Sequence, residues 1–435
     1  METKSDWKLI GFFISLYILT LPLNGLLELP IVIKKIQLPE IAFIILFFLT
    51  IIKVFQTKLW LKWQISIIDK ALILYFLAML LSASFHPTRA SFFEVLGLTY
   101  LIILYVIINF YFIGSEKNIR SFLVQTMLIS GVFTCIIAYF GGVLLLLGFE
   151  NRLVPYYENY PIFGNIHRMS ALAEEPIMLM SILSIFILII VADNLNKQRN
   201  SKIFIALTLM TLVCILTFTK SFAMLIASII VMLSYHFRIL ERVKSLIWVG
   251  ILSIFLFLSH FSFVTKFNFE RNIYCHALEK HPFEEFKNSY LLRTCYGVLK
   301  EMNMIVFFRY PLVGVGGGNF SNYIRQLKTE GIYPRYLSDF DPLSTYFGAL
   351  SELGIIGFIA LIALYYAIFL TWKRVAFSNF EKNEDTPFWI LLGGVLLFMC
   401  SEGFVTDTMN FRHYWVVIAC LAVYSRKLNT YSLDT

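Results

Sequence analysis

Long apolar runs separated by short polar segments make up most of this chain. The runs are continuous and about 20 residues long, so they predict membrane-spanning helices rather than the alternating strands of a membrane barrel. Twelve spans are expected, at residues 9–29, 38–56, 67–85, 93–113, 122–148, 171–192, 203–218, 221–236, 244–263, 344–371, 387–401 and 412–425. The predicted fold class is an all-α polytopic membrane protein with one large extracytoplasmic loop that contains helices.

The spacing of the runs divides the chain into three parts. Residues 1–263 form an N-terminal bundle of about nine spans, residues 264–343 form the long loop, and residues 344–435 form a C-terminal bundle of about three spans. The first run lacks the small residues of a cleavage site, so it is expected to remain as the first span.

Composition supports a membrane protein. Of the 435 residues, 58% are hydrophobic and only 15% are charged, whereas soluble domains have about 45–50% apolar and about 25% charged residues. A soluble enzyme, a disordered chain and a secreted disulfide scaffold are therefore excluded.

The distribution of basic residues predicts the topology. With the N-terminus inside, 19 of the 36 Lys and Arg residues fall in inner segments, 7 in short outer loops and 10 in the long loop. Basic residues concentrate in cytoplasmic loops, so both termini are expected in the cytoplasm. The net charge of +8 then needs no nucleic-acid partner.

The long loop contains one apolar stripe with helical spacing, made of Leu291, Cys295, Val298 and Met302. On that helix Arg293 would point away from the stripe, toward solvent or a catalytic cavity. Cys275 and Cys295 are the only cysteines expected outside the membrane, so we predict a disulfide between them.

Two short segments could bind phosphate oxygens at helix N-termini. Pro176 fits the first turn of the sixth span, with Glu175 before it and Arg168 close above. A plain ion pair between Arg168 and a neighbouring glutamate is the alternative. In Thr-Phe-Thr-Lys-Ser, residues 217–221, Ser221 is expected to cap the eighth span beneath Lys220, which could instead be a membrane-edge anchor.

Three further patterns lie in or after the long loop. The glycine-rich segment 311–320 lacks the Gly-Lys-Ser/Thr of a phosphate loop and is interpreted as a sharp backbone turn. Asp339 and Asp341 could supply a base, hold a divalent cation or cap a turn. Glu352 lies inside a span, so it needs a partner or a wet cavity.

These motifs occur in an order that resembles the O-antigen polymerase and O-antigen ligase superfamily, which are GT-C-type membrane glycosyltransferases. The motifs are Arg168 to Glu175-Pro176, Thr-Phe-Thr-Lys-Ser at 217–221, Arg293, Pro-Leu-Val-Gly-Val-Gly-Gly-Gly-Asn-Phe at 311–320, and Glu352-Leu-Gly-Ile-Ile-Gly. The resemblance covers about residues 160–360, and covers the remainder by topology only.

The resemblance implies transfer of a glycan from undecaprenyl diphosphate at the periplasmic face of a bacterial inner membrane, without a metal or other cofactor. Arg168 and Arg293 match arginines that contact the diphosphate, and Lys220 stands where many members have Arg. The expected catalytic residues are Arg168, Arg293, Glu175 and Asp341, and the expected substrate-binding residues are Lys220, Ser221, Glu352 and Arg309. A lipid diphosphate is a good leaving group, so charge stabilisation matters more than an acid.

The function expected from these features is a polymerase of O-antigen or another surface polysaccharide. Ligases of the family usually have His-Asn shortly before the matched glutamate, where this chain has Leu343 and Ser344. A ligase or protein oligosaccharyltransferase is the alternative, and a transporter or flippase is the second. Transporters usually show repeats and broken helices, and the sequence shows neither. Expected partners are the lipid-linked oligosaccharide, the bilayer, a chain-length regulator and a flippase.

Overall fold

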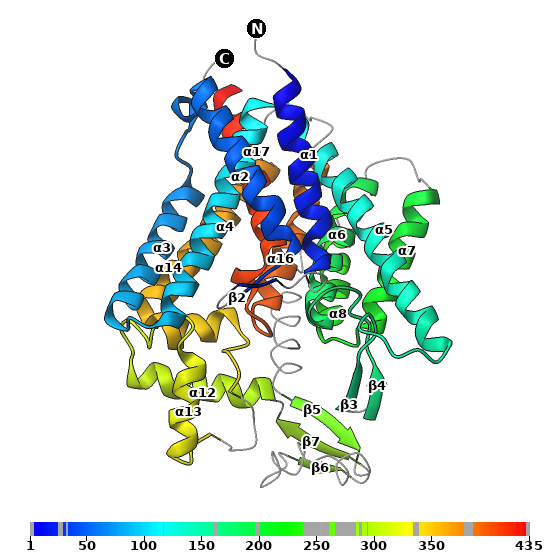
Figure 1. Cartoon of the computed structure of the whole chain (residues 1–435), viewed down its shortest axis with the longest axis vertical. Coiled ribbons are helices and arrows are strands. Elements are labelled where there is room, and N and C mark those ends of the chain that lie inside the picture. Colours follow the sequence, from blue (N-terminus) through cyan, green and yellow to red (C-terminus); the bar gives the residue numbers. More distant parts are fainter. Residues whose placement is uncertain are drawn as a thin grey trace.

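The computed structural model describes residues 4–24, 29–31, 34–115, 117–160, 164–195, 201–237, 254, 261–265, 284–286, 289–293, 295–333, 339–377 and 386–431. Most of these residues are helical, and the helices form one elongated bundle (Figure 1). Helix α1 begins, and α17 ends, at the same end of this bundle. The opposite end has β3, β4, α12 and α13, and we call it the loop end.

Most bundle helices follow the predicted runs, but the first helix ends at Thr20 instead of residue 29, and the run at 387–401 forms two helices. The bundle helices are α1 (Lys4–Thr20), α2 (Leu38–Thr57), α3 (Ile67–Phe85), α4 (Arg89–Gly114), α5 (Ile119–Leu146), α6 (Pro176–Asn194), α7 (Ser201–Leu216), α8 (Ser221–His236), α14 (Thr345–Phe377), α15 (Thr386–Leu391), α16 (Gly393–Glu402) and α17 (Arg412–Tyr431). Short 3-10 turns lie at η1 (Leu21–Leu23), η2 (Leu59–Lys62) and η4 (Thr408–Asn410).

Six of the described helices are long and apolar enough to cross a membrane: α2, α3, α4, α5, α6 and α14. Four shorter apolar helical segments add to them, at Trp7–Leu23, Ser201–Leu216, Ser221–His236 and Thr386–Glu402. The count of twelve is therefore not confirmed, and the run at 244–263 lies largely outside the described residues. Large apolar side chains such as Phe48 and Phe55 are exposed on the bundle surface, which suits a hydrocarbon solvent.

Small sheets supplement the helices, so the all-α expectation needs a correction. Strands β1 (Leu29–Ile31) and β2 (Lys34–Ile36) form one antiparallel pair, and β3 (Tyr156–Tyr160) and β4 (Gly164–His167) form another. Near the loop end, β5 (Phe261–Thr265), β6 (Glu284–Phe286) and β7 (Ser289–Arg293) form a sheet in the order β5-β7-β6. The loop end also has the helices α12 (Cys295–Arg309) and α13 (Phe320–Thr329).

Strand β7 corrects the helical stripe predicted in the long loop. Leu291 and Arg293 belong to this strand, where Leu291 pairs with Phe263 and Arg293 with Phe261, and α12 begins only at Cys295. Pairing with β5, a strand distant in sequence, overrides the local periodicity. The side chain of Arg293 is not described, and the predicted Cys275–Cys295 disulfide falls outside the described residues because Cys275 does.

Helix α14 reverses direction at Gly354, so the predicted single span at 344–371 is wrong in its first part. Gly354 has φ 64° and ψ −165°, a conformation essentially restricted to glycine. The rings of Tyr346 and Tyr365 lie 5.7 Å apart, whereas an unbroken straight helix would separate these residues by about 28 Å. The Thr408 hydroxyl contacts both Thr345 and Tyr365. Residues 345–353 therefore fold back along the helix that follows.

The glycine-rich loop supplies hydrogen bonds that the reversal in α14 needs. Val315 and Gly316 donate backbone N–H groups to the carbonyls of Ser351 and Glu352. On the other side, Ile355 donates its N–H to Pro311 O at 2.8 Å. The interpretation of 311–320 as a sharp turn agrees with this geometry, because Gly314, Gly316 and Gly318 all have positive φ. The turn joins the long loop to α14.

Buried ion pairs connect helices away from the loop end. Arg426 of α17 contacts both carboxylate oxygens of Asp69 on α3, at 2.6 and 2.5 Å, and its guanidinium lies 4.3 Å from the centre of the Trp63 ring. A second pair joins Arg120 of α5 to Asp193 of α6 at 2.6 Å. Charges inside an apolar bundle persist when they are paired in this way.

We expect Arg426→Met to lower stability strongly, because it leaves the Asp69 carboxylate buried without its cation. Breaking one side of a buried pair costs about 3–5 kcal/mol. The melting temperature of the detergent-solubilised protein measures the effect. Arg374→Met, at an exposed position of α14, is the control and should melt like the parent; equal melting of both variants would contradict the prediction.

Candidate functional site

Arg168 is held against the segment between α7 and α8. Its Nε donates to the backbone oxygen of Thr217 at 2.8 Å, and its guanidinium lies 4.7 Å from the centre of the Tyr157 ring. The next backbone N–H, of Met169, donates to Leu216 O at 3.0 Å. Two motifs that are distant in sequence, Arg168 and residues 217–221, therefore meet at the loop end of the bundle.

Residues 217–221 form a tight hairpin between α7 and α8, and its capping differs from the expectation. Helix α7 ends at Leu216 and α8 begins at Ser221, with Phe218 reversing the chain at φ 49°. Lys220, not Ser221, occupies the N-cap position, and it makes no side-chain cap. The expectation that Ser221 caps α8 is wrong, because the turn places it already inside the first helical turn, where it is buried.

Glu175 immediately precedes α6, which begins at Pro176 as predicted. Glu175 is exposed, yet the surrounding protein removes enough water to raise the pKa of its carboxyl. The neighbouring charge of Glu174 raises this pKa further, and the cation of Arg168 opposes both effects. Glu175 therefore lies within electrostatic reach of Arg168.

Lys300 of α12 adds a cation that the sequence did not single out. Only 2% of this residue is exposed, and its Nζ lies 5.7 Å from the centre of the Phe347 ring on α14. Burial and then the charge of Lys220 lower the pKa of Lys300 to about 8. Helix α12 thus brings a second ammonium group close to the hairpin. The sequence alone does not distinguish Lys300 as a site residue, because it is one of ten basic residues in the long loop.

A buried polar cluster joins α6, α16 and α17. The Ser181 hydroxyl lies 2.7 Å from Glu402 Oε2 and 2.9 Å from His413 Nε2, and the Tyr414 hydroxyl also bonds to Glu402. These four residues are almost fully buried. They fix the relative positions of three helices, and sequence reasoning missed them because Ser181 is far from the other three in sequence.

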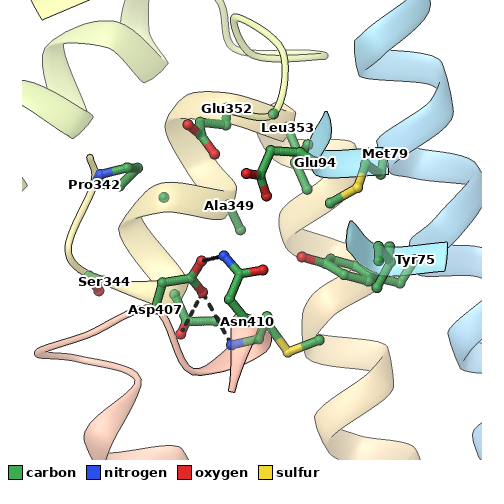
Figure 2. Close-up of a pocket in the computed structure, with 15 residues that line it drawn as sticks. Tyr75, Met79, Glu94, Pro342, Ser344, Ala349, Glu352, Leu353, Asp407 and Asn410 are labelled. Carbon is green, nitrogen blue, oxygen red and sulfur yellow. Dashed lines mark hydrogen bonds between the residues drawn. The ribbon is translucent and has the colours of Figure 1, made fainter. Parts of the chain in front are cut away.

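A small acidic pocket lies where α4, α14 and the segment before η4 meet (Figure 2). Its carboxylates are Glu94, Glu352 and Asp407, and its volume is about 40 Å³. Glu352 accepts a hydrogen bond from the backbone N–H of Phe320 at 3.3 Å. The expectation that Glu352 needs a partner or a cavity is confirmed, since it has both.

Asp407 is held by three donors in this pocket: the Thr345 hydroxyl, the Met409 N–H and the Asn410 amide, the last at 2.7 Å. Burial raises the pKa of Asp407 to about 6, and Glu94 contributes further in the same direction. Within the described part of the chain, no group of three or more His, Cys, Asp or Glu residues has an arrangement suited to a metal ion.

The two aspartates near the start of α14 have different surroundings. Asp339 forms ion pairs with Arg325 at 2.8 Å and Lys328 at 2.5 Å, and these hydrogen bonds lower its pKa. Asp341 is exposed, and its charge acts on Asp407. The structure therefore places Asp341 beside the acidic pocket, and does not place it with Arg168.

Arg309 lies at the end of α12, where its guanidinium makes a two-point contact with Glu330 at 3.2 and 2.8 Å. This pair braces α12 against the end of α13. A substrate-binding role for Arg309 stays a prediction, as do the roles assigned to the other site residues.

Comparison with known proteins places this chain in no family. No protein-family model matches the sequence, and no curated protein matches it.

Proposed function

We propose that this chain is a polymerase of O-antigen or a related surface polysaccharide, acting at the periplasmic face of a bacterial inner membrane. The observation that carries the proposal is the meeting of Arg168 with the 217–221 hairpin, joined by the Arg168–Thr217 bond. This contact brings together an arginine, Lys220 and the N-termini of α6 and α8, which suits a diphosphate. We assign to Arg293, on β7, the role of the second diphosphate arginine that the resemblance implies.

The proposed reaction moves the growing glycan from its lipid carrier onto a new lipid-linked repeat unit. A hydroxyl of the acceptor sugar attacks the anomeric carbon of the donor, and a carbon–oxygen bond forms there. The bond from that carbon to the diphosphate oxygen breaks, and the electron pair leaves with undecaprenyl diphosphate. Arg168 and Lys220 stabilise the charge that develops on this leaving group.

Glu175 is the proposed base for the hydroxyl proton. Partial loss of water around this exposed carboxyl and the charge of Glu174 raise its pKa, so it accepts a proton more readily than a fully hydrated carboxylate. The Arg168 cation acts on the same carboxyl, which supports a position for Glu175 near the proposed diphosphate site. Asp341, the other proposed catalytic carboxylate, adjoins the acidic pocket.

A polymerase is favoured over a ligase by the residues that replace the His-Asn pair. Leu343 packs against the apolar core of the loop-end helices. The Ser344 hydroxyl donates to Gly403 O at 2.9 Å, and this residue is 1% exposed. Leu343 and Ser344 both have structural roles in packing and hydrogen bonding. Neither residue replaces the histidine that ligases of the family usually have at this place.

The reversal of α14 corrects the expectation that no helix is broken, and broken helices are common in transporters. In those proteins the exposed backbone lines a substrate or ion site. Here the backbone groups on both sides of Gly354 bond to residues 311–316. The break in α14 therefore holds residues 311–316 against this helix. It gives the transporter or flippase alternative no support.

A strain that lacks the chromosomal gene tests the proposed function. Polymerase loss should leave surface glycan with a single repeat unit and remove all longer chains, and plasmid-borne protein should restore them. Loss of every attached glycan would instead indicate a ligase or flippase. An unchanged ladder of glycan lengths would contradict all three.

A further inference from the structure

The connection between α2 and α3, residues 58–66, lies at the end of the bundle where α1 begins and α17 ends (Figure 1). It contains the 3-10 turn η2. Large apolar side chains in and beside this connection face outward instead of packing inside the bundle. Four of them are each more than half exposed: Phe55, Trp60, Leu61 and Ile65.

Three lysines alternate with these apolar residues along the chain. Lys58, Lys62 and Lys70 are all exposed, and none of them forms an ion pair with any residue that the structure describes. Asp69 is the only acidic residue between positions 53 and 70, and its carboxylate is buried in the ion pair with Arg426. The outer face of the connection is therefore both apolar and positively charged.

The backbone of the connection is held in place from inside the bundle. Arg426 donates from Nε to the backbone oxygen of Gln64 at 2.9 Å, and its guanidinium lies 4.3 Å from the centre of the Trp63 ring. Ser66 and Asp69 form a capping box at the start of α3. The exposed side chains therefore project from a fixed backbone, so a ligand that binds them does not have to order the chain first.

Lys58 occupies a backbone position that favours glycine. It ends α2 in the left-handed conformation, with φ 51°, which glycine adopts without strain. A lysine one residue earlier, in place of Thr57, would interact with the helix dipole without this strain. The lysine at position 58 therefore has a use that the end of the helix alone does not explain.

A face with both properties suits the surface of an anionic bilayer. A soluble anion would contact the lysines and leave the apolar side chains in water, whereas a phospholipid offers a phosphate to the lysines and acyl chains to the apolar residues. Aromatic and basic side chains gather at the level of the headgroups for this reason.

We propose that the α2–α3 connection binds an anionic phospholipid of the leaflet at this end of the bundle. The phosphate lies at Lys58 and Lys62, and Trp60 and Leu61 lie among the acyl chains. The predicted topology makes this the cytoplasmic leaflet. The assignment does not rest on the proposed function, because it involves the opposite end of the bundle from Arg168 and the long loop.

Native mass spectrometry of the full-length, delipidated protein in detergent tests the lysines. Dioleoyl phosphatidylglycerol and dioleoyl phosphatidylcholine are added separately, and the parent should bind the phosphatidylglycerol more tightly. Combining Lys58→Gln, Lys62→Gln and Lys70→Gln should weaken phosphatidylglycerol binding by about a hundredfold, since an anionic surface attracts each lysine by about fivefold. Binding of phosphatidylcholine should not change.

The matched control removes the same charge from three other exposed lysines, on α1, before α5 and on α14. Combining Lys8→Gln, Lys117→Gln and Lys373→Gln should leave the affinity for phosphatidylglycerol as in the parent. All six substitutions are at exposed positions, so every variant should melt at the parent temperature in detergent without lipid.

Combining Trp60→Ser and Leu61→Ser tests the acyl contacts independently of the lysines. This variant should bind phosphatidylglycerol about tenfold more weakly, because less apolar surface leaves water on binding. Glycerol 3-phosphate, the soluble headgroup analogue, should not displace the lipid from the parent.

Three results would overturn the assignment. The first is equal affinity of the parent for the two phospholipids, and the second is an equal loss in the two triple-lysine variants. The third is unchanged lipid binding in the Trp60 and Leu61 variant together with displacement by glycerol 3-phosphate, which would indicate a site for a soluble anion.

Discussion

Arg168→Ala should remove long glycan chains almost completely when the variant is expressed in the gene-deletion strain. The guanidinium is fixed between Thr217 O and the Tyr157 ring, beside the proposed diphosphate site. One charge-assisted hydrogen bond is worth about 1.5–3 kcal/mol, or about ten- to a hundredfold in rate. Gel separation of surface glycan by chain length measures the loss, and immunoblotting confirms equal membrane levels.

The conservative change Arg168→Lys should also fail to restore long chains. Lysine lacks the Nε–H that donates to Thr217 O, and its ammonium cannot form the planar two-point contact of a guanidinium. Lys220→Arg should be tolerated, because it keeps the charge and matches the residue that the family uses there.

Arg152→Ala is the control for this series. Arg152 is exposed in the segment between α5 and β3 and belongs to none of the matched motifs, so the variant should make chains of normal length. Normal chains from both Arg168→Ala and Arg293→Ala would show that the diphosphate site is assigned to the wrong residues.

Gly354→Ala should separate the long loop from α14 and abolish the folded state or its activity. A Cβ at this position would lie 2.4 Å from the backbone carbon and oxygen of Leu312, far inside contact distance. The backbone angles add a penalty of about 1–3 kcal/mol for any residue other than glycine. Because the backbone fixes the position of a Cβ and the Leu312 atoms it meets are also backbone, no rotamer change can relieve the clash. Protease protection of the long loop in membrane vesicles, together with the glycan ladder, measures the effect.

Gly97→Ala is the matched control for this substitution. Gly97 lies within α4, and a Cβ there would meet no atom within 4 Å. Alanine in place of a helical glycine stabilises by up to about 1 kcal/mol. Protection of the loop in Gly354→Ala equal to that in Gly97→Ala would disprove the role assigned to Gly354.

Local sequence was sufficient for the features that depend on neighbouring residues. The apolar runs located most bundle helices to within a few residues, with α1 and the start of α14 as exceptions, because in a bilayer every backbone group must bond within its own segment. Pro176 marked the start of α6 for a similarly local reason, since its missing N–H is harmless only in a first turn. The glycines at 314, 316 and 318 indicated a sharp turn, which their positive φ values bear out.

Predictions that depended on distant partners were less accurate. The stripe beginning at Leu291 has helical spacing. Leu291 and Arg293 nevertheless form part of a strand, because they pair with β5. Ser221 has the chemistry of a cap, but the turn at Phe218 moves it one position into the helix. Periodicity describes only the neighbours of a residue within its own element, so it could not anticipate either outcome.

The sequence by itself determined that this chain is largely helical with apolar segments long enough to cross a membrane, where most of those segments lie, and which motifs are candidates for a phosphate site. The tertiary structure decided which residues meet: Arg168 with the 217–221 hairpin, Lys300 with Phe347, and the glycine-rich loop with the backbone around Gly354. Gly354 is the one residue near the reversal of α14 that indicates it in the local sequence. The backbone groups that hydrogen-bond to the residues around this reversal lie in a separate segment, before α13. Contacts of that range depend on how the chain packs, and packing is a property of the whole fold.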